Sequence, residues 1–286
     1  MMRVLLIPLL LSALAPVAVA AAPRPLLRIC TGAKGGGYHH VGVGLAKALA
    51  DTVEVEVIQT HGSWENLEAI DQEPRRCDAV IAQEDAYALY QFEKPESRLT
   101  MDRMVTLYAE AVHLICNRTV QADDVAGLHP QRHRILVNQY GSGTYITWRL
   151  FGRLDPSFAR YKASELPLEE GLLKVVDGVE AQCMVMVSQP GQGTARLADR
   201  GFGDKLKLLT IDAEALHAKV GRDRRPVYRT QPVDPQTYPR LLDKPRATQV
   251  VDAVFFASPQ WKARHPDAAA ALARALLTLV AELRTR

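Results

Sequence analysis

Two glycine-rich turns are the parts of this sequence best suited to binding chemistry. The first is Gly32-Ala33-Lys34-Gly35-Gly36-Gly37, and the second is Gly141-Ser142-Gly143-Thr144. Each lies between an apolar strand pattern and a helical pattern. A helix start offers unpaired N–H groups and the positive end of the helix dipole, and glycine lets a ligand approach that backbone closely. The two turns therefore predict a site for a small anion.

Four polar side chains near the turns are further candidates. Ser63 and Asn66 stand at a predicted helix start, where they either contact a ligand or only cap the helix. Gln83 and Gln189 each follow a predicted strand, so hydrogen bonding to a ligand and exposure in a loop are both open. We expect all four to contribute to the site.

Aromatic side chains complete the predicted site. Tyr38, Trp64 and Tyr145 adjoin the turns, where they either line the pocket or pack in the core. The ligand-binding residues that we predict are Lys34, Gly35, Gly36, Gly37, Tyr38, Ser63, Trp64, Asn66, Gln83, Ser142, Gly143, Thr144, Tyr145 and Gln189.

Patterns typical of enzymes are missing from the turns. They match neither of the glycine-rich nucleotide-binding motifs, G-x-G-x-x-G and G-x-x-x-x-G-K-[ST]. Tyr140-Gly141-Ser142-Gly143 lacks the arrangement of a nucleophile elbow. The side chains that could hold a metal lack the spacing of known zinc motifs; they are His39, His40, His61, Glu84 and Asp85. We therefore expect a binding protein with no catalytic residue, cofactor or metal, and a secreted hydrolase or metalloenzyme is the disfavoured alternative.

Strands and helices alternate around the first turn. The apolar patterns predict strands over Leu26–Thr31, Val53–Thr60 and Ala79–Ala82, and a helix over Tyr38–Asp51. Another helix is expected to begin at Ser63, in the N-cap position. This order predicts a parallel α/β sheet.

The same order recurs at an offset of 106 residues. At this offset Gly35 falls on Gly141 and Gln83 falls on Gln189, and strand and helix patterns between 134 and 189 match those of the first unit. Ligands of open α/β sheets bind beyond the carboxyl ends of the strands. Two similar lobes facing each other would therefore place both turns and both glutamines on one cleft.

Composition and charge narrow the class of protein. The 286 residues are 48% hydrophobic and 23% charged, which is ordinary for a folded protein and excludes collagen-like or disordered chains. The formal charge of +3 comes from 35 basic and 32 acidic residues with no long basic run, so we expect no nucleic-acid partner.

The N-terminus resembles a secretory signal. A short basic start precedes an apolar run that ends in Ala18-Val19-Ala20, which predicts cleavage before Ala21 and a periplasmic location. A membrane anchor is the alternative, but Pro8 and Pro16 lie inside the run. The C-terminal helix expected over Pro266–Leu283 carries charges on its apolar face and is not a membrane span.

The four cysteines are widely spaced. Cys30, Cys77, Cys116 and Cys183 form no C-x-x-C pair, so neither zinc nor thioredoxin-type chemistry is expected. Each lies in or beside a predicted buried strand. Buried free thiols and one structural disulfide are both open, and the sequence does not choose a pairing.

Several segments together resemble the TAXI family, the extracytoplasmic solute-binding subunits of TRAP transporters. They are Ile29 to Tyr38, Thr60 to Asn66, Gln83-Glu84-Asp85, Gly141 to Thr144, and Thr237-Tyr238-Pro239 before Val250 to Val254. The segments follow one another in the family's order and cover nearly all of the chain after the signal.

The resemblance implies a fold, a ligand class and a partner. The fold is the two-lobed type II periplasmic-binding-protein fold, with the ligand cleft between the lobes. The implied organisation is a signal peptide over 1–20, lobe 1 over 21–112, lobe 2 over 113–225, and a return to lobe 1 with a C-terminal helix over 226–286. The implied ligands are small carboxylates, delivered to membrane-embedded TRAP permease subunits by a binding protein that we expect to be monomeric.

One position departs from the family pattern. Tyr145 stands where the family commonly has Arg after Gly-Ser-Gly-Thr. We hypothesise that Lys34 replaces that arginine as the counter-charge of the ligand, while Arg149 lies one turn further along the helix. A less acidic or larger ligand is the alternative. An ABC-type binding protein for phosphate, phosphonate or sulfonate and a ligand-sensing periplasmic protein are the competing functions.

Overall fold

The computed structural model describes residues 23–161, 163–222 and 224–284. The predicted signal peptide lies outside these residues. Ten strands form one mixed sheet in the described chain, and a further pair forms a small ribbon. The strands of the main sheet are β1 (Leu26–Cys30), β2 (Glu54–Ile58), β3 (Ala79–Gln83), β4 (Asp102–Asn117), β5 (Ile135–Val137), β6 (Ala163–Glu165), β7 (Cys183–Ser188), β8 (Leu206–Leu209), β11 (Tyr228–Val233) and β12 (Arg246–Ala257). The ribbon pairs β9 (Lys219–Val220) with β10 (Arg225–Pro226).

Nine α-helices cover the sheet in the described chain. They are α1 (Gly37–Ala48), α2 (Ser63–Asp71), α3 (Glu84–Glu93), α4 (Gly143–Leu154), α5 (Pro156–Ala159), α6 (Leu168–Asp177), α7 (Gly193–Phe202), α8 (Pro259–Arg264) and α9 (Pro266–Arg284). A short 3-10 helix spans Glu214–His217. None of the helices in the described part of the chain combines the length and apolar character needed to cross a membrane.

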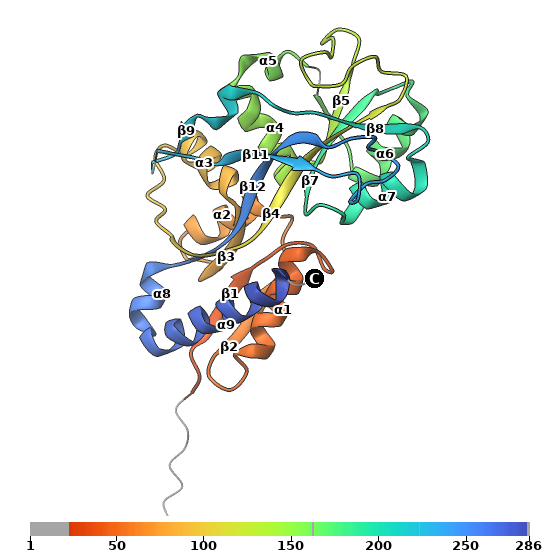
Figure 1. Ribbon diagram of the computed structural model, residues 1–286. Helices are drawn as coiled ribbons and strands as arrows, with labels where there is room; N and C mark the ends of the chain where they lie inside the picture. Colours follow the sequence, from red (N-terminus) through yellow and green to blue (C-terminus); the bar gives the residue numbers. More distant parts are fainter. Residues whose placement is uncertain (1–22, 162, 223, 285–286) are drawn as a thin grey trace, which may run out of the picture.

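The sheet order shows how two lobes are joined. Its path is β2-β1-β3-β12-β4-β7-β5-β6, with β11 added to β12 and β8 added to β4. The pairs β1–β2, β1–β3, β5–β6 and β5–β7 are parallel, as the strand–helix alternation predicts. The long strands β4 and β12 pair antiparallel with each other and with their neighbours. They run through the middle of the molecule and connect the lobes (Figure 1).

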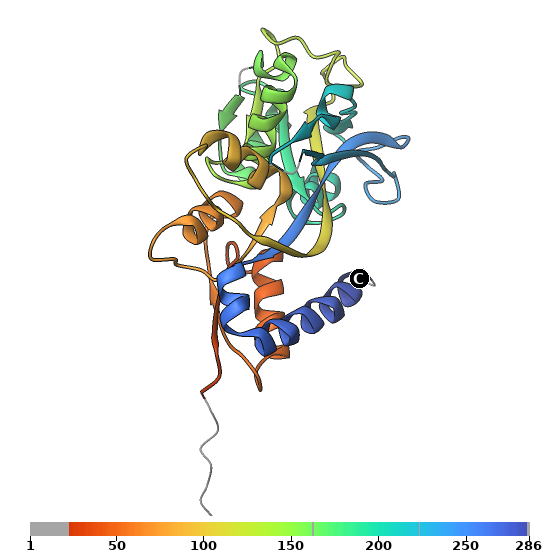
Figure 2. The same ribbon diagram turned by 90° about the vertical axis from the view of Figure 1, so that its left-hand side faces the viewer.

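Two of the three apolar cores belong to one lobe each. Leu27, Leu45 and Leu272 belong to the core that α1, α8 and α9 cover in lobe 1. Leu172 and Met184 belong to the core on the corresponding face of lobe 2. Figures 1 and 2 place α1 and α9 beside β1, apart from α6 and α7. On this face the lobes therefore have separate interiors.

A third core is shared between the lobes on the opposite face of the sheet. It includes Leu67 of α2, Leu89 of α3, Ile146 of α4 and Val185 of β7, all buried. The helices α2, α3 and α4 therefore pack as one layer across both lobes. The lobes are joined on this face and separate on the other, which is the arrangement that a hinge requires.

The repeat in the sequence corresponds to a repeat in structure. The helices α1 and α4 begin at Gly37 and Gly143, the positions that the 106-residue offset relates. Gly35 and Gly141, which precede them, have φ angles of +82° and +76°. A side chain is strained in this left-handed region, so both turns need glycine there. The helices α2 and α6 also correspond at this offset to within a residue.

The prediction that Ser63 caps a helix is wrong. The N-cap of α2 is Gly62, with a φ of +129°, and Ser63 is the first helical residue. The Ser63 hydroxyl instead accepts a hydrogen bond from the backbone N–H of Gln83 at 3.1 Å. The glycine turns the chain one residue earlier than the N-cap pattern indicates, which frees the Ser63 side chain to contact β3.

All four cysteines form disulfides. One bond joins Cys30 to Cys77 in lobe 1, and the other joins Cys116 to Cys183 in lobe 2. Each bond ties neighbouring strand regions of its own lobe and leaves the other lobe unlinked. The structure therefore has two disulfide bonds, whereas one was considered from the sequence. The pairing of the strands brings each pair of buried cysteines together.

Candidate functional site

The first glycine turn lies open at the start of α1. Gly35 and Gly36 are exposed, and no atom lies within 4 Å of the place where a Cβ on Gly35 would stand. Gly36 is the N-cap of α1 and has no capping side chain. Lys34 is exposed on this turn. The turn therefore presents backbone and one lysine to an incoming molecule.

The second turn is more tightly held at the start of α4. The Ser142 hydroxyl accepts a hydrogen bond from the Tyr145 N–H at 3.3 Å, and Ser142 is the N-cap. Thr144 is buried, and its hydroxyl accepts from the Val187 N–H at 3.0 Å. These bonds fix the helix start against β7 of lobe 2.

A polar cluster, which we call the seam, joins the two turns; its Ser63, Gln83 and Glu110 are buried, and its other members are half-buried. Its members are Tyr38, Ser63, Gln83, Glu110 and Gly143. The Tyr38 hydroxyl donates to Glu110 Oε2 at 3.4 Å, and the Gln83 side-chain amide also donates to this carboxyl group. The Tyr38 hydroxyl hydrogen-bonds to Ser63 as well. The seam thus links α1, α2, β3 and the long strand β4.

The side chain of Gln83 makes the contact between the seam and lobe 2. A Cβ on Gly143 would lie 2.1 Å from Gln83 Oε1, so the side-chain amide rests directly on the backbone of the second turn. Gln83 is 2% exposed, and Oε1 has no hydrogen-bond partner among the described residues. A buried oxygen without a partner costs free energy, so this atom is an open acceptor between the lobes.

Burial controls the protonation of the seam. It raises the pKa of Glu110 to about 8, an effect that the nearby Asp85 strengthens and the hydrogen bonds from Gln83 and Tyr38 oppose. Burial also raises the pKa of Tyr38 and of the neighbouring Tyr108 well above the ordinary value. Glu110 makes no ion pair within the described chain. The seam is therefore mostly uncharged at neutral pH.

Asp85 joins the lobes beside the seam. Its Oδ2 accepts hydrogen bonds from Thr147 of α4 at 2.6 Å and from Tyr228 of β11 at 2.7 Å. Asp85 is fully buried, and burial raises its pKa to about 6 in spite of these two bonds. The Asp85 carboxyl group therefore links α3, α4 and β11.

Some predicted site residues lie outside the seam. Asn66 is fully buried, and its amide bonds to the Thr31 and Ile81 carbonyls at 2.5 and 2.7 Å while its oxygen accepts from Thr60 at 2.6 Å. The side chain of Asn66 therefore holds the strand ends on which the first turn stands. Gln189 is half-buried after β7.

The aromatic candidates occupy two surroundings. Tyr38 belongs to the seam, whereas Trp64 is buried and packs on Tyr90 with ring centroids 5.2 Å apart. Trp64 and Tyr145 line a narrow crevice between α2 and α4. The Tyr145 hydroxyl accepts from Arg149, whose guanidinium also pairs with Glu93 at 2.6 Å. Arg149 is thus committed to α3 and does not replace the missing cation.

Glu110, Asp85 and Thr147 are functional candidates that the pattern search missed. Glu110 stands in the apolar run Ala109 to Ile115, and a charged residue inside a buried strand is itself a signal. Asp85 ends the Gln83-Glu84-Asp85 segment and stands among the side chains that lack a metal-binding spacing, and neither pattern indicates a buried acid that joins the lobes. Thr147 carries no sequence signal, because its role depends on the packing of α4 against α3.

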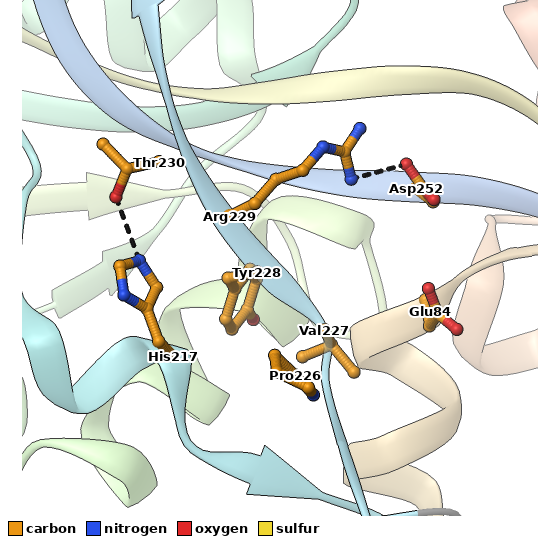
Figure 3. Close-up of a pocket in the computed structure, with 8 residues that line it drawn as sticks. All are labelled: Glu84, His217, Pro226, Val227, Tyr228, Arg229, Thr230 and Asp252. Atoms are coloured by element: carbon orange, nitrogen blue, oxygen red, sulfur yellow. Dashed lines mark hydrogen bonds and ion pairs between the residues drawn. The ribbon is translucent and has the colours of Figure 1, made fainter.

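A separate pocket of about 550 Å³ is lined by residues of α3, β10, β11, β12 and the short 3-10 helix (Figure 3). Its charged groups are already paired, since Arg229 bonds to Asp252 at 2.8 Å and Arg225 to Glu84 at 2.5 Å. His217 shares a hydrogen bond with Thr230 at 2.9 Å. None of the predicted ligand-binding residues lines this pocket. In the described residues no group of His, Cys, Asp and Glu side chains has the geometry of a metal site.

Comparison with known proteins places this arrangement in a family. A model described as the NMT1-like family matches residues 29–265. The chain belongs to the NMT1-like family. The match covers both glycine turns, the seam and the long strands β4 and β12, so the NMT1-like unit includes the whole candidate site. A search of curated proteins found no significant match.

Solved structures similar to this NMT1-like chain share its fold. A TctC solute-binding protein from Polaromonas has a TM-score of 0.54 at 14% identity, over 93% of this chain and 88% of that one. The periplasmic aliphatic sulphonate-binding protein SsuA from Escherichia coli has a TM-score of 0.50 at 13% identity, over 92% and 80%. The ligand-binding component of an ABC-type import system from Staphylococcus aureus has a TM-score of 0.50 at 12% identity, over 88% and 72%. The predicted two-lobed periplasmic-binding-protein fold is therefore confirmed.

Proposed function

We propose that this protein is an extracytoplasmic solute-binding protein of a transport system and that it captures a small organic anion of the carboxylate class. The observation that carries the proposal is the contact between the two lobes at the seam. There the start of α4 lies against Gln83, and Tyr38 in the first turn of α1 hydrogen-bonds to Glu110. Two helix starts supply N–H groups and dipole ends for an anion, and Lys34 adds a charge.

Capture requires no bond chemistry. The lobes are separate on the face of α1 and α7 and joined by β4 and β12, so they move about these long strands. A ligand that contacts both helix starts favours the closed form over the open one, because only the closed form makes both sets of contacts. The closed form then offers a different surface to a membrane partner.

The proposed partner is a membrane permease of the TRAP type, on the strength of the TAXI-like segments. The alternative is an ABC importer of an oxyanion, because the similar Staphylococcus aureus protein is a component of an ABC-type import system and the similar Escherichia coli protein binds aliphatic sulphonates. Neighbouring genes separate the two: a fused TRAP permease gene supports the first partner, and an adjacent ATPase gene supports the second. A sensory role would place a signalling protein there instead.

A thermal-shift screen with succinate, ethanesulfonate, inorganic phosphate and neutral sugars tests the ligand class. A ligand at 100 times its dissociation constant stabilises the folded protein by about 2.7 kcal/mol, which such a screen detects. We expect at least one anion to raise the melting temperature and the sugars to have no effect. Stabilisation by neutral compounds alone would refute the helix-start argument.

Lys34→Ala tests the proposed counter-charge. Loss of a charge-assisted hydrogen bond costs about 1.5–3 kcal/mol, so the dissociation constant of the best anion should rise by about 10- to 150-fold. Arg149→Ala is the matched control, because that guanidinium is held by Glu93 and Tyr145. Unchanged binding by Lys34→Ala would assign the attraction to the helix starts alone.

A further inference from the structure

Glu110 is the one carboxyl group of the seam, and its position is unusual for a protein that binds anions. It lies in the middle of β4, where the long strand passes between the lobes, and it is 9% exposed. The first residues of α1 reach it through Tyr38. An ionised carboxylate at this point would repel an anion held at the two helix starts.

The groups that act on Glu110 come from α1, β3, α3 and β4 itself, its partner on the neighbouring strand β12 is Val251, and none of these groups is a cation. They are Tyr38 from α1, Tyr108 from β4, and Gln83 and Asp85 from the end of β3 and the start of α3. From α4, Gly143 contacts Gln83 and carries no charge. The surroundings therefore favour the protonated carboxyl group.

The hydrogen bonds of Glu110 leave its own proton without a described acceptor. Tyr38 and the Gln83 amide both donate to the carboxyl group. A protonated carboxyl group also donates one O–H bond. Gln83 Oε1 is a second seam atom that lacks a partner, and Gln83 is 98% buried against the start of α4. The hydrogen bonding of the seam is therefore incomplete in the protein alone.

We propose that Glu110 determines ligand specificity, and that its protonated carboxyl group donates a hydrogen bond to an oxygen of the bound anion. The proposal rests on the proposed function as an anion-binding protein. No atom is transferred: the proton stays on Glu110 and is shared with the ligand oxygen. Hydrogen bonds of this O–H···O⁻ kind are short and strong, and the bond accepts only ligands with an exposed anionic or carbonyl oxygen.

This role makes ligand affinity depend on pH. Once Glu110 ionises, the donor is lost and a negative charge faces the ligand. With the pKa of Glu110 at about 8, the dissociation constant should rise about 30-fold between about pH 6.5 and about pH 9.5. Tyr38 and Tyr108 remain neutral throughout, since burial raises the pKa of each well above its ordinary value.

The test is titration calorimetry with ethanesulfonate, whose charge is constant in this range, and with succinate, which is mostly doubly ionised at pH 6.5 and fully so at higher pH. The wild type should lose affinity as the pH rises. Glu110→Gln keeps a neutral donor but replaces the strong O–H···O⁻ bond by a weaker amide N–H bond, so it should bind more weakly than the wild type at pH 6.5 and lose none of that affinity to Glu110 ionisation at higher pH. Any pH dependence that remains in Glu110→Gln belongs to groups other than Glu110.

Asp85→Asn is the matched control, because Asp85 is a second buried acid close to the first. The fall in affinity should persist in this variant and move to lower pH, since the charge of Asp85 contributes to the raised pKa of Glu110. An infrared band of a protonated carboxyl group that disappears near pH 8 and shifts when succinate is added gives a measurement on the wild type alone.

Each outcome has one meaning. Affinity that is constant or rises with pH, or a fall that Glu110→Gln retains in full, overturns the role of Glu110 and leaves the anion site standing. An infrared band unaffected by a bound anion does the same. Failure of both succinate and ethanesulfonate to bind at pH 6.5, together with failure of inorganic phosphate in the screen, refutes the proposed anion function and the role of Glu110 with it.

Discussion

Gly143→Ala is the sharpest perturbation of the seam, because one methyl group would enter the contact between the lobes. The new Cβ would lie 2.1 Å from Gln83 Oε1, 2.7 Å from Cδ and 2.9 Å from Nε2. The Gln83 side chain has little room to retreat, since it is 2% exposed and its amide is bonded to Glu110. Overpacking of this kind costs about 1–3 kcal/mol. The higher helix propensity of alanine than of glycine offsets at most about 1 kcal/mol of this loss of stability.

We therefore expect Gly143→Ala to lose about 1–2 kcal/mol of unfolding free energy, measured by urea denaturation. In a Gln83→Ala background the methyl group has space, so the same substitution should cost nothing or stabilise the protein. Gly171→Ala in α6 is the control, because its Cβ would meet side-chain atoms no closer than 3.5 Å. Equal costs in the two backgrounds would show that Gln83 and Gly143 do not touch and would refute the contact between the lobes.

Three further changes test the surroundings of the site. The pKa of Asp85 is raised from 3.8 to about 6, so between these pH values the folded state holds a proton that the unfolded state releases, and the free energy of unfolding falls as the pH rises. Asp85→Asn should therefore be about 3 kcal/mol more stable than the wild type above pH 6, measured by urea denaturation at several pH values. A gain in stability that does not depend on pH would contradict this. Asn66→Ala removes three buried hydrogen bonds and should cost about 2–4 kcal/mol by the same measurement, whereas a loss under 1 kcal/mol would contradict the bonding described. Replacing Cys116 and Cys183 together by alanine opens a link across 67 residues and should cost about 2–4 kcal/mol, seen as a lower urea midpoint, and an unchanged midpoint would speak against the bond.

Local order was predictable because it depends on short patterns. The first parallel unit, with β1, α1, β2 and β3, follows from apolar periodicity and from the glycines that end and begin elements. The offset of 106 residues identified the second unit, and the left-handed glycines at 35 and 141 explain why both turns have the same form. The two-lobed fold followed from the repeat and from family resemblance together.

Long-range features were less predictable, since they depend on which segments pair. The strands β4 and β12 are antiparallel within a sheet expected to be parallel, and no short pattern distinguishes the two. The cysteine pairing followed only from that sheet, because β4 lies beside β7 and β1 beside β3. The N-cap of α2 was also predicted wrongly, although it depends on local sequence: the cap is Gly62, one residue before Ser63.

The seam shows how a chain with little net charge can be suited to anions. Its helix starts and the exposed Lys34 are attractive features, while Glu110 and Asp85 would oppose an anion if both were ionised. Burial resolves this conflict for Glu110, because the free energy of desolvation keeps its proton in place at neutral pH. An acid that is neutral because it is buried between the lobes is a hydrogen-bond donor, and opening the lobes to water would lower its pKa. Closure and protonation are then linked, so a more acidic medium should favour the closed, ligand-holding form.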